Sequence, residues 1–125
     1  MSGVAPAFRP LGPRSAPRWS IVGTLTPTIE VLPAVVDRVA GRAPVLFDSG
    51  IRRGTDILKG LGYGASAVLI GRPYLYGLSV AGPEGVRDVV NILRSELEAA
   101  MALTGRTRLE EIDRSIFWKS RDYSS

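Results

Sequence analysis

A chain of 125 residues, 45% of them apolar, is large enough for one globular domain and too hydrophobic to stay disordered. It contains no cysteine and no histidine, which excludes disulfides, thiolate metal sites and most zinc sites. The net charge of +4 is concentrated at the start, because the first 23 residues hold three arginines and no acid. The nearly neutral remainder argues against nucleic-acid binding, and no apolar run is long enough to cross a membrane.

The start of the chain differs in composition from the rest. Residues 1–23 contain Pro6, Pro10, Pro13 and Pro17, and no apolar period runs through them. This composition predicts a disordered segment. Arginines without acids would also suit an organelle transit peptide, but the prolines oppose the amphipathic helix that such a peptide needs. We therefore expect a cytoplasmic location.

Helical and strand patterns alternate beyond this segment. Apolar residues at helical spacing follow Thr28, which is a suitable cap, and Gly41 is suited to end this helix. Short, continuous apolar runs at residues 44–47 and 67–70 are typical of strands buried on both faces of a parallel sheet. A second helix is expected between them, over residues 55–61.

Three more helices are expected after the second strand. Pro73 suits the first turn of a short helix through Leu78, a long amphipathic helix covers residues 84–103, and a short helix over residues 109–116 closes the chain. One face of the long helix carries the apolar residues Val86, Val90, Leu93, Leu97 and Met101. Strands that cross over through a helix are parallel, so the pattern predicts an α/β fold. Two strands leave both sheet edges unpaired, which indicates part of a larger unit.

Each expected strand is followed by a turn rich in glycine and arginine. The first is DSGIRRG at residues 48–54, and the second is IGRP at residues 70–73. Glycine lets the backbone approach a phosphate oxygen closely, and helix N-termini supply N–H donors. The guanidinium group of Arg52 or Arg53 can donate to two phosphate oxygens at once. Asp48 is placed to fix a ligand hydroxyl or to hold the loop. A single such turn is common and often only structural, but two together favour one phosphate site.

Other polar and aromatic residues are interpreted as structural. Glu110 and Glu111 are adjacent on the expected helix, so they do not face each other as a catalytic pair and are interpreted as solvent-exposed charges. Gly60 and Gly62 are expected to lower the stability of their helix by about 1 kcal/mol each. Four aromatic residues are interpreted as packing residues: Tyr63, Tyr74, Tyr76 and Trp118.

The two turns and their strands carry a family resemblance. DSGIRRGTDI at residues 48–57 and AVLIGRPYLYGL at residues 67–78 closely resemble the end of the FMN-dependent α-hydroxy-acid dehydrogenases and oxidases. Members of this family include glycolate oxidase, lactate oxidase and monooxygenase, and mandelate dehydrogenase. The match runs from about residue 24 to residue 117 and begins with TIEVLP at residues 28–33.

The resemblance implies a fold, a cofactor and a set of contacts. It implies that residues 24–118 are the C-terminal portion of a (β/α)8 TIM barrel, namely strands seven and eight with flanking helices, between an unrelated segment over residues 1–23 and a tail over residues 119–125. It implies that the phosphate of FMN is held by the two turns. The contacts carried over are Asp48, Ser49, Gly50, Ile51, Arg52, Gly71 and Arg72.

The chain departs from the family pattern before residue 24. The family places a histidine base and a substrate-binding arginine there, in an Asn-His-Gly-Gly-Arg run, whereas residues 14–20 lack this pattern. No catalytic residue is therefore assigned, because proton abstraction needs a positioned base. We expect an FMN-binding C-terminal fragment of an oxidoreductase that oxidises 2-hydroxy acids to 2-oxo acids, inactive alone and acting on substrate only within a full-length parent.

Two other hypotheses remain open. The chain could be a non-catalytic quarter-barrel that associates with itself or with a partner chain through its strand edges and apolar helix faces. It could also be a basic nucleic-acid-binding protein, although that hypothesis depends only on the arginines of residues 1–23.

Overall fold

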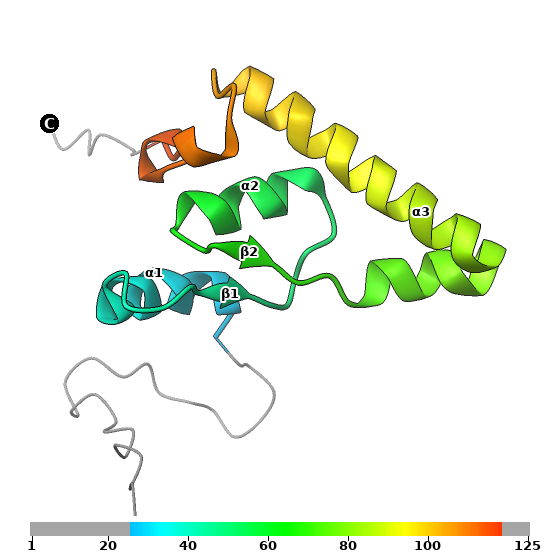
Figure 1. Cartoon of the computed structure of the whole chain (residues 1–125), viewed down its shortest axis with the longest axis horizontal. Coiled ribbons are helices and arrows are strands. Elements are labelled where there is room, and N and C mark those ends of the chain that lie inside the picture. Colours follow the sequence, from blue (N-terminus) through cyan, green and yellow to red (C-terminus); the bar gives the residue numbers. More distant parts are fainter. Residues whose placement is uncertain (1–25, 119–125) are drawn as a thin grey trace, which may run out of the picture.

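The computed structural model describes residues 26–118. The expectations for the proline-rich start and for the tail after residue 118 lie outside these residues. The elements in chain order are α1 (Thr28–Val39), β1 (Leu46–Phe47), α2 (Gly54–Gly62), β2 (Ala67–Val68), α3 (Arg72–Leu103) and the 3-10 turns η1 (Leu109–Glu111) and η2 (Arg114–Ile116). Figure 1 shows α1 and α2 beside the two strands, with α3 extending past α2.

The two strands pair in parallel, which confirms the βα pattern. Leu46 is in register with Ala67, and the N–H of Leu69 donates to the carbonyl of Phe47 at 2.8 Å. The expectation that both faces are buried is wrong. Phe47 is buried, but Leu46 is 58% exposed. The reason is that α1, α2 and α3 all pack on the Phe47 side, and no described element covers the other face.

The main core lies between the strands and these three helices. It contains six buried residues, to which each helix contributes: Leu32, Phe47, Ile51, Ile57, Ala65 and Leu93. Helix α1 begins as expected at Thr28, but its cap position is Pro27, so the side chain of Thr28 does not cap it. The helix ends where Ala40 and Gly41 both take positive φ, at 49° and 73°.

The glycines of α2 allow close packing on both of its sides. A Cβ at position 60 would lie 2.9 Å from Cδ1 of Phe47, and one at position 62 would lie 2.5 Å from Cδ1 of Ile116. Such distances are too short for ordinary carbon contacts. Gly60 and Gly62 have low helix propensity, but because they lack a side chain they let α2 pack closely on β1 and on η2.

Helix α3 consists of two arms, which match the two helices expected over residues 73–78 and 84–103. Ala81 and Gly82 are non-helical, and the chain reverses sharply there (Figure 1). Gly77 and Gly85 touch backbone to backbone, so a side chain at either position would overlap the other arm. One detail of the expected apolar face is wrong, because Val90 is 48% exposed and Val89 packs on the core instead.

The end of the described chain forms two 3-10 turns, η1 and η2, in place of the single helix expected over residues 109–116. Ile112 and Asp113 are extended and separate η1 from η2. Ile112 is buried with Leu58, Ala100 and Met101 in a second core cluster. This burial explains the break, because an extended Ile112 can enter the core between two turns.

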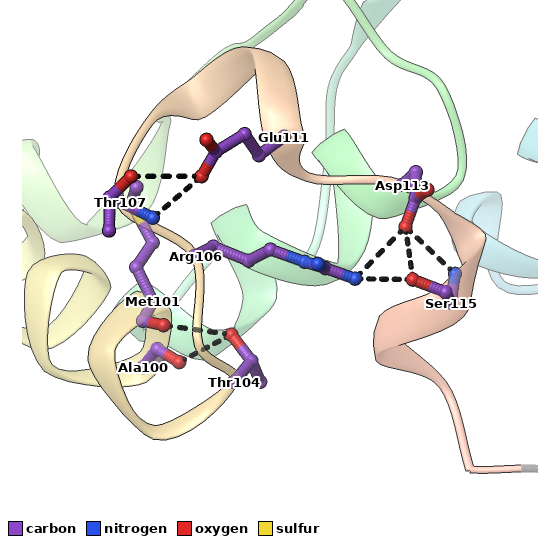
Figure 2. Close-up of polar contacts among 8 residues, drawn as sticks. All are labelled: Ala100, Met101, Thr104, Arg106, Thr107, Glu111, Asp113 and Ser115. Carbon is purple, nitrogen blue, oxygen red and sulfur yellow. Dashed lines mark hydrogen bonds and ion pairs between the residues drawn. The ribbon is translucent and has the colours of Figure 1, made fainter.

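Figure 2 shows the contacts that close this segment. Glu111 is exposed, as expected, and it also accepts from the N–H and the hydroxyl of Thr107, at 2.8 and 3.1 Å. Arg106 donates to Asp113 at 3.3 Å, and Asp113 accepts from the N–H of Ser115 at 3.0 Å.

The aromatic residues behave in two ways. Tyr63 stacks on Phe117 with ring centroids 4.2 Å apart, which confirms its packing role. Trp118 is 84% exposed, so its expected packing on the terminal helix is wrong. Tyr76 is also exposed.

Candidate functional site

The two glycine–arginine turns meet at one pocket of about 560 Å³. All seven residues carried over from the resemblance line it: Asp48, Ser49, Gly50, Ile51, Arg52, Gly71 and Arg72. They meet because the strands are parallel and adjacent, so the loops after both strands leave the same edge of the sheet. Pro73 and Tyr76 also line the pocket. Tyr76 had been interpreted as a packing residue, and its spacing of one helical turn from Arg72 is the signal that could have placed it here.

The first turn has an unusual backbone conformation. Ser49 and Gly50 both have positive φ, at 83° and 82°. A serine in this region is sterically strained, at a cost on the order of 1 kcal/mol or more. The carboxylate of Asp48 accepts from the N–H of Ser49 at 2.7 Å, so Asp48 holds the loop, one of the two roles expected for it.

The N–H groups at the start of α2 are largely taken by carboxylates of the chain itself. Asp56 accepts from the N–H groups of Arg52 and Arg53 at 3.1 and 3.0 Å. Glu96 accepts from the N–H of Gly54 at 2.8 Å. These bonds, and the negative charges that make them, disfavour an anion at the first turn of α2. The expectation that both helix N-termini serve a phosphate therefore does not hold for α2.

The start of α3 is different. No side chain caps it, its first turn holds no acidic residue, and Pro73 has no N–H to donate. The N–H groups of Gly71 and Arg72 have no acceptor among residues 26–118. The same holds for Gly50 and Ile51 in the first turn. Four backbone donors from the two turns can therefore serve an anion, and the positive end of the α3 dipole favours one.

The neighbouring arginines of the first turn have separate roles. Arg53 donates to Glu96 at 2.8 Å, so its side chain is bound to α3. The N–H of Gly54 and the Arg53 guanidinium hold the pKa of Glu96 below its usual range. Arg52 and Arg72 line the pocket, and within the described chain neither forms an ion pair. Each turn thus contributes one arginine without an ion-pair partner among residues 26–118 to the lining of the pocket.

Residues 26–118 contain neither a candidate metal site nor a candidate membrane-spanning helix. No group of three or more acidic, histidine or cysteine side chains is placed to hold a metal ion. No helix in this part of the chain is both long and apolar enough to span a membrane.

Comparison with known proteins identifies the family. Residues 22–119 match the model of the FMN-dependent dehydrogenases. The 2-hydroxyacid oxidase of Dictyostelium discoideum is 54% identical over 100 residues, which cover 80% of this chain and 26% of that protein. The L-lactate oxidase of a Nostoc species is 54% identical over 88 residues, 70% of this chain and 24% of that protein.

Solved structures agree with these relatives. An oxidised active mutant of (S)-mandelate dehydrogenase is 38% identical with a TM-score of 0.69, over 74% of this chain and 26% of that one. A mandelate oxidase mutant with a monooxide FMN adduct is 45% identical with a TM-score of 0.64, over 66% of this chain and 26% of that one. These neighbours are FMN-dependent enzymes with the TIM-barrel fold.

The chain belongs to the FMN-dependent dehydrogenase family, which confirms the resemblance inferred from its motifs. It is thus related to flavoprotein oxidoreductases that act on 2-hydroxy acids, and the cofactor of the family is FMN. It spans about a quarter of the length of the curated relatives that it matches. The family match does not favour the alternative of a non-catalytic quarter-barrel that associates with itself or with a partner chain.

Proposed function

We propose that this chain supplies the FMN phosphate site of a 2-hydroxy-acid oxidoreductase. The observation that carries the proposal is the meeting of two turns, from two parallel strands, at one pocket that holds Arg52 and Arg72. The pocket suits a phosphate for two reasons. Its two arginines carry positive charge, and its two turns offer four backbone N–H groups as hydrogen-bond donors.

The pair of turns after β1 and β2 also indicates where this chain would lie in a barrel. In TIM barrels, a phosphate site is frequently formed by the loops after strands seven and eight. We therefore assign β1 and β2 to strands seven and eight, and residues 24–118 to the C-terminal portion of the barrel. The exposed face that carries Leu46 is then the inward face, which the remaining strands would cover.

The roles of the residues follow from their contacts. Arg52 and Arg72 neutralise the phosphate, and the N–H groups of Gly50 and Gly71 orient it. Asp48 holds the first turn through its bond to the N–H of Ser49. Bound FMN supplies the electron acceptor for oxidation of a 2-hydroxy acid to a 2-oxo acid. The chain contains no histidine to act as the base, so we expect it to hold the cofactor without turning over substrate by itself.

Titration with flavins tests the proposal. The purified chain is titrated into FMN, and binding is followed by flavin fluorescence anisotropy, with riboflavin as the control that lacks the phosphate. We expect saturable binding of FMN and much weaker binding of riboflavin, because the contacts proposed here are to the phosphate. Equal binding of both flavins, or no binding of FMN, would contradict the proposal.

A further inference from the structure

One carboxylate from the second arm of α3 holds the start of α2. Oε2 of Glu96 accepts from the backbone N–H of Gly54 at 2.8 Å, and Oε1 accepts from Nη1 of Arg53 at 2.8 Å. Gly54 and Glu96 are 42 residues apart in the sequence. Glu96 thus binds both the backbone and a side chain of the residues that follow Arg52.

Close packing fixes the same junction. A Cβ at position 54 would overlap backbone atoms of Glu96 and Leu97, so α2 starts directly against the α3 backbone. Only glycine fits at this distance. The end of the first turn therefore packs closely on the α3 backbone at Gly54 and donates two hydrogen bonds to the side chain of Glu96.

Helix α3 connects the two turns of the pocket. Its first residue is Arg72, which lines the pocket, and its second arm carries Glu96. The backbone contact between Gly77 and Gly85 sets one arm against the other. The position of Arg52 relative to Arg72 therefore depends on how the first turn is attached to the second arm.

We propose that Glu96 is a positioning residue for the phosphate pocket, holding residues 52–54 on α3 so that Arg52 and Arg72 face the same anion. The inference rests on the proposed function of the pocket. The ion pair to Glu96 also keeps Arg53 away from Arg52, so that only one of the two neighbouring guanidinium groups faces the ligand.

Substitutions at Glu96 separate this role from general stability. Glu96→Ala removes both hydrogen bonds, whereas Glu96→Gln keeps an acceptor for the N–H of Gly54 and removes the charge. The matched control is Glu98→Ala on the same arm, which loses only an exposed pair with Arg94 at 2.8 Å. FMN affinity is expressed per folded molecule, with the folded fraction taken from the thermal melt of each variant. Hydrogen exchange of the Gly54 amide, followed by NMR, reports on the junction without ligand.

We expect Glu96→Ala to weaken FMN binding by about tenfold or more, because it removes charge-assisted hydrogen bonds that fix the turn. Glu96→Gln should weaken binding less, by about threefold, because one hydrogen bond remains. Glu98→Ala should bind as the wild type does. The Gly54 amide should exchange faster in Glu96→Ala than in the wild type and in Glu98→Ala.

The outcomes distinguish the inference from the proposed function. If the wild-type chain does not bind FMN, the proposed function fails and the inference fails with it. If the wild type binds FMN and Glu96→Ala binds equally well per folded molecule, only the inference is overturned. If Glu96→Ala does not fold, Glu96→Gln decides, and unchanged affinity in that folded variant overturns the inference.

Discussion

Arg52 and Arg53 show how neighbouring identical residues come to lie in different surroundings. Arg53 is bound by Glu96, whereas Arg52 lines the pocket. The composition of the turn leaves both arginines as candidates for the phosphate, and only the family resemblance singles out Arg52. The partner that decides between them lies 43 residues from Arg53 in the sequence, so no local pattern reveals it.

Hydrogen-bonded carboxylates make stability depend on pH. The N–H of Gly54 lowers the pKa of Glu96, the N–H of Thr107 lowers that of Glu111, and the hydroxyl of Ser115 lowers that of Asp113. A carboxyl whose pKa is lower in the folded state stabilises the fold above its unfolded pKa, and this contribution is lost as the pH falls through the folded pKa. The urea midpoint should therefore stay level down to about pH 5 and fall below about pH 4.

Neighbouring glutamates supply the control for this pH dependence. Glu111→Gln should reduce the loss of stability at acid pH, because Glu111 accepts from Thr107 and Arg108. Glu110→Gln is the matched control, because this neighbouring exposed carboxylate accepts no hydrogen bond from the described residues. A urea midpoint for the wild type that is the same at about pH 3 and pH 7 would refute this account.

At the level of elements, α2 begins directly after the first turn of the pocket, and glycines determine its position. Gly60 lies against Phe47 of β1, and Gly54 lies against the backbone of α3. From the sequence, Gly60 and Gly62 are expected only to lower helix stability, and Gly54 is expected only to let the first turn approach a phosphate oxygen. Their benefit is a tertiary contact, which propensity does not include.

Gly54→Ala tests this packing. The new methyl group would overlap backbone atoms of Glu96 and Leu97, which cannot move aside by changing a rotamer. We expect the free energy of unfolding to fall by about 1–3 kcal/mol, as for other overpacked sites. Thr55→Ala at the next, exposed position is the control and should be neutral or slightly stabilising. Equal urea midpoints for Gly54→Ala and Thr55→Ala would show that the junction can widen without cost.

Much of the arrangement of elements could be predicted from local patterns. The helix–strand alternation, the parallel pairing and the meeting of the two turns follow from apolar periodicity and from the geometry of βα units. The break at Ile112 and the exposure of Trp118 could not be predicted in this way. Both depend on which surfaces meet in three dimensions, and a periodic pattern carries no information about that.

At the level of the whole molecule, the described residues have one covered face and one open face. The three helices pack on the Phe47 side of the two-stranded sheet, and Leu46 on the other side is 58% exposed. The expectation of two buried faces was wrong for this chain, and it would hold in a closed barrel, where strands are covered on both sides. All residues that line the pocket lie in the loops after β1 and β2 or at the start of α3, so we expect it to bind phosphate without the rest of the barrel.

Mapping FMN on the chain by amide chemical shifts tests the central claim most directly. FMN is added to the labelled wild-type chain and to the variants Arg52→Gln and Arg72→Gln. We expect shifts at Gly50, Gly71 and Arg72 that riboflavin does not produce, with affinity reduced by about tenfold in each variant. Shifts confined to residues outside the two turns, or equal affinity in both variants and the wild type, would contradict it.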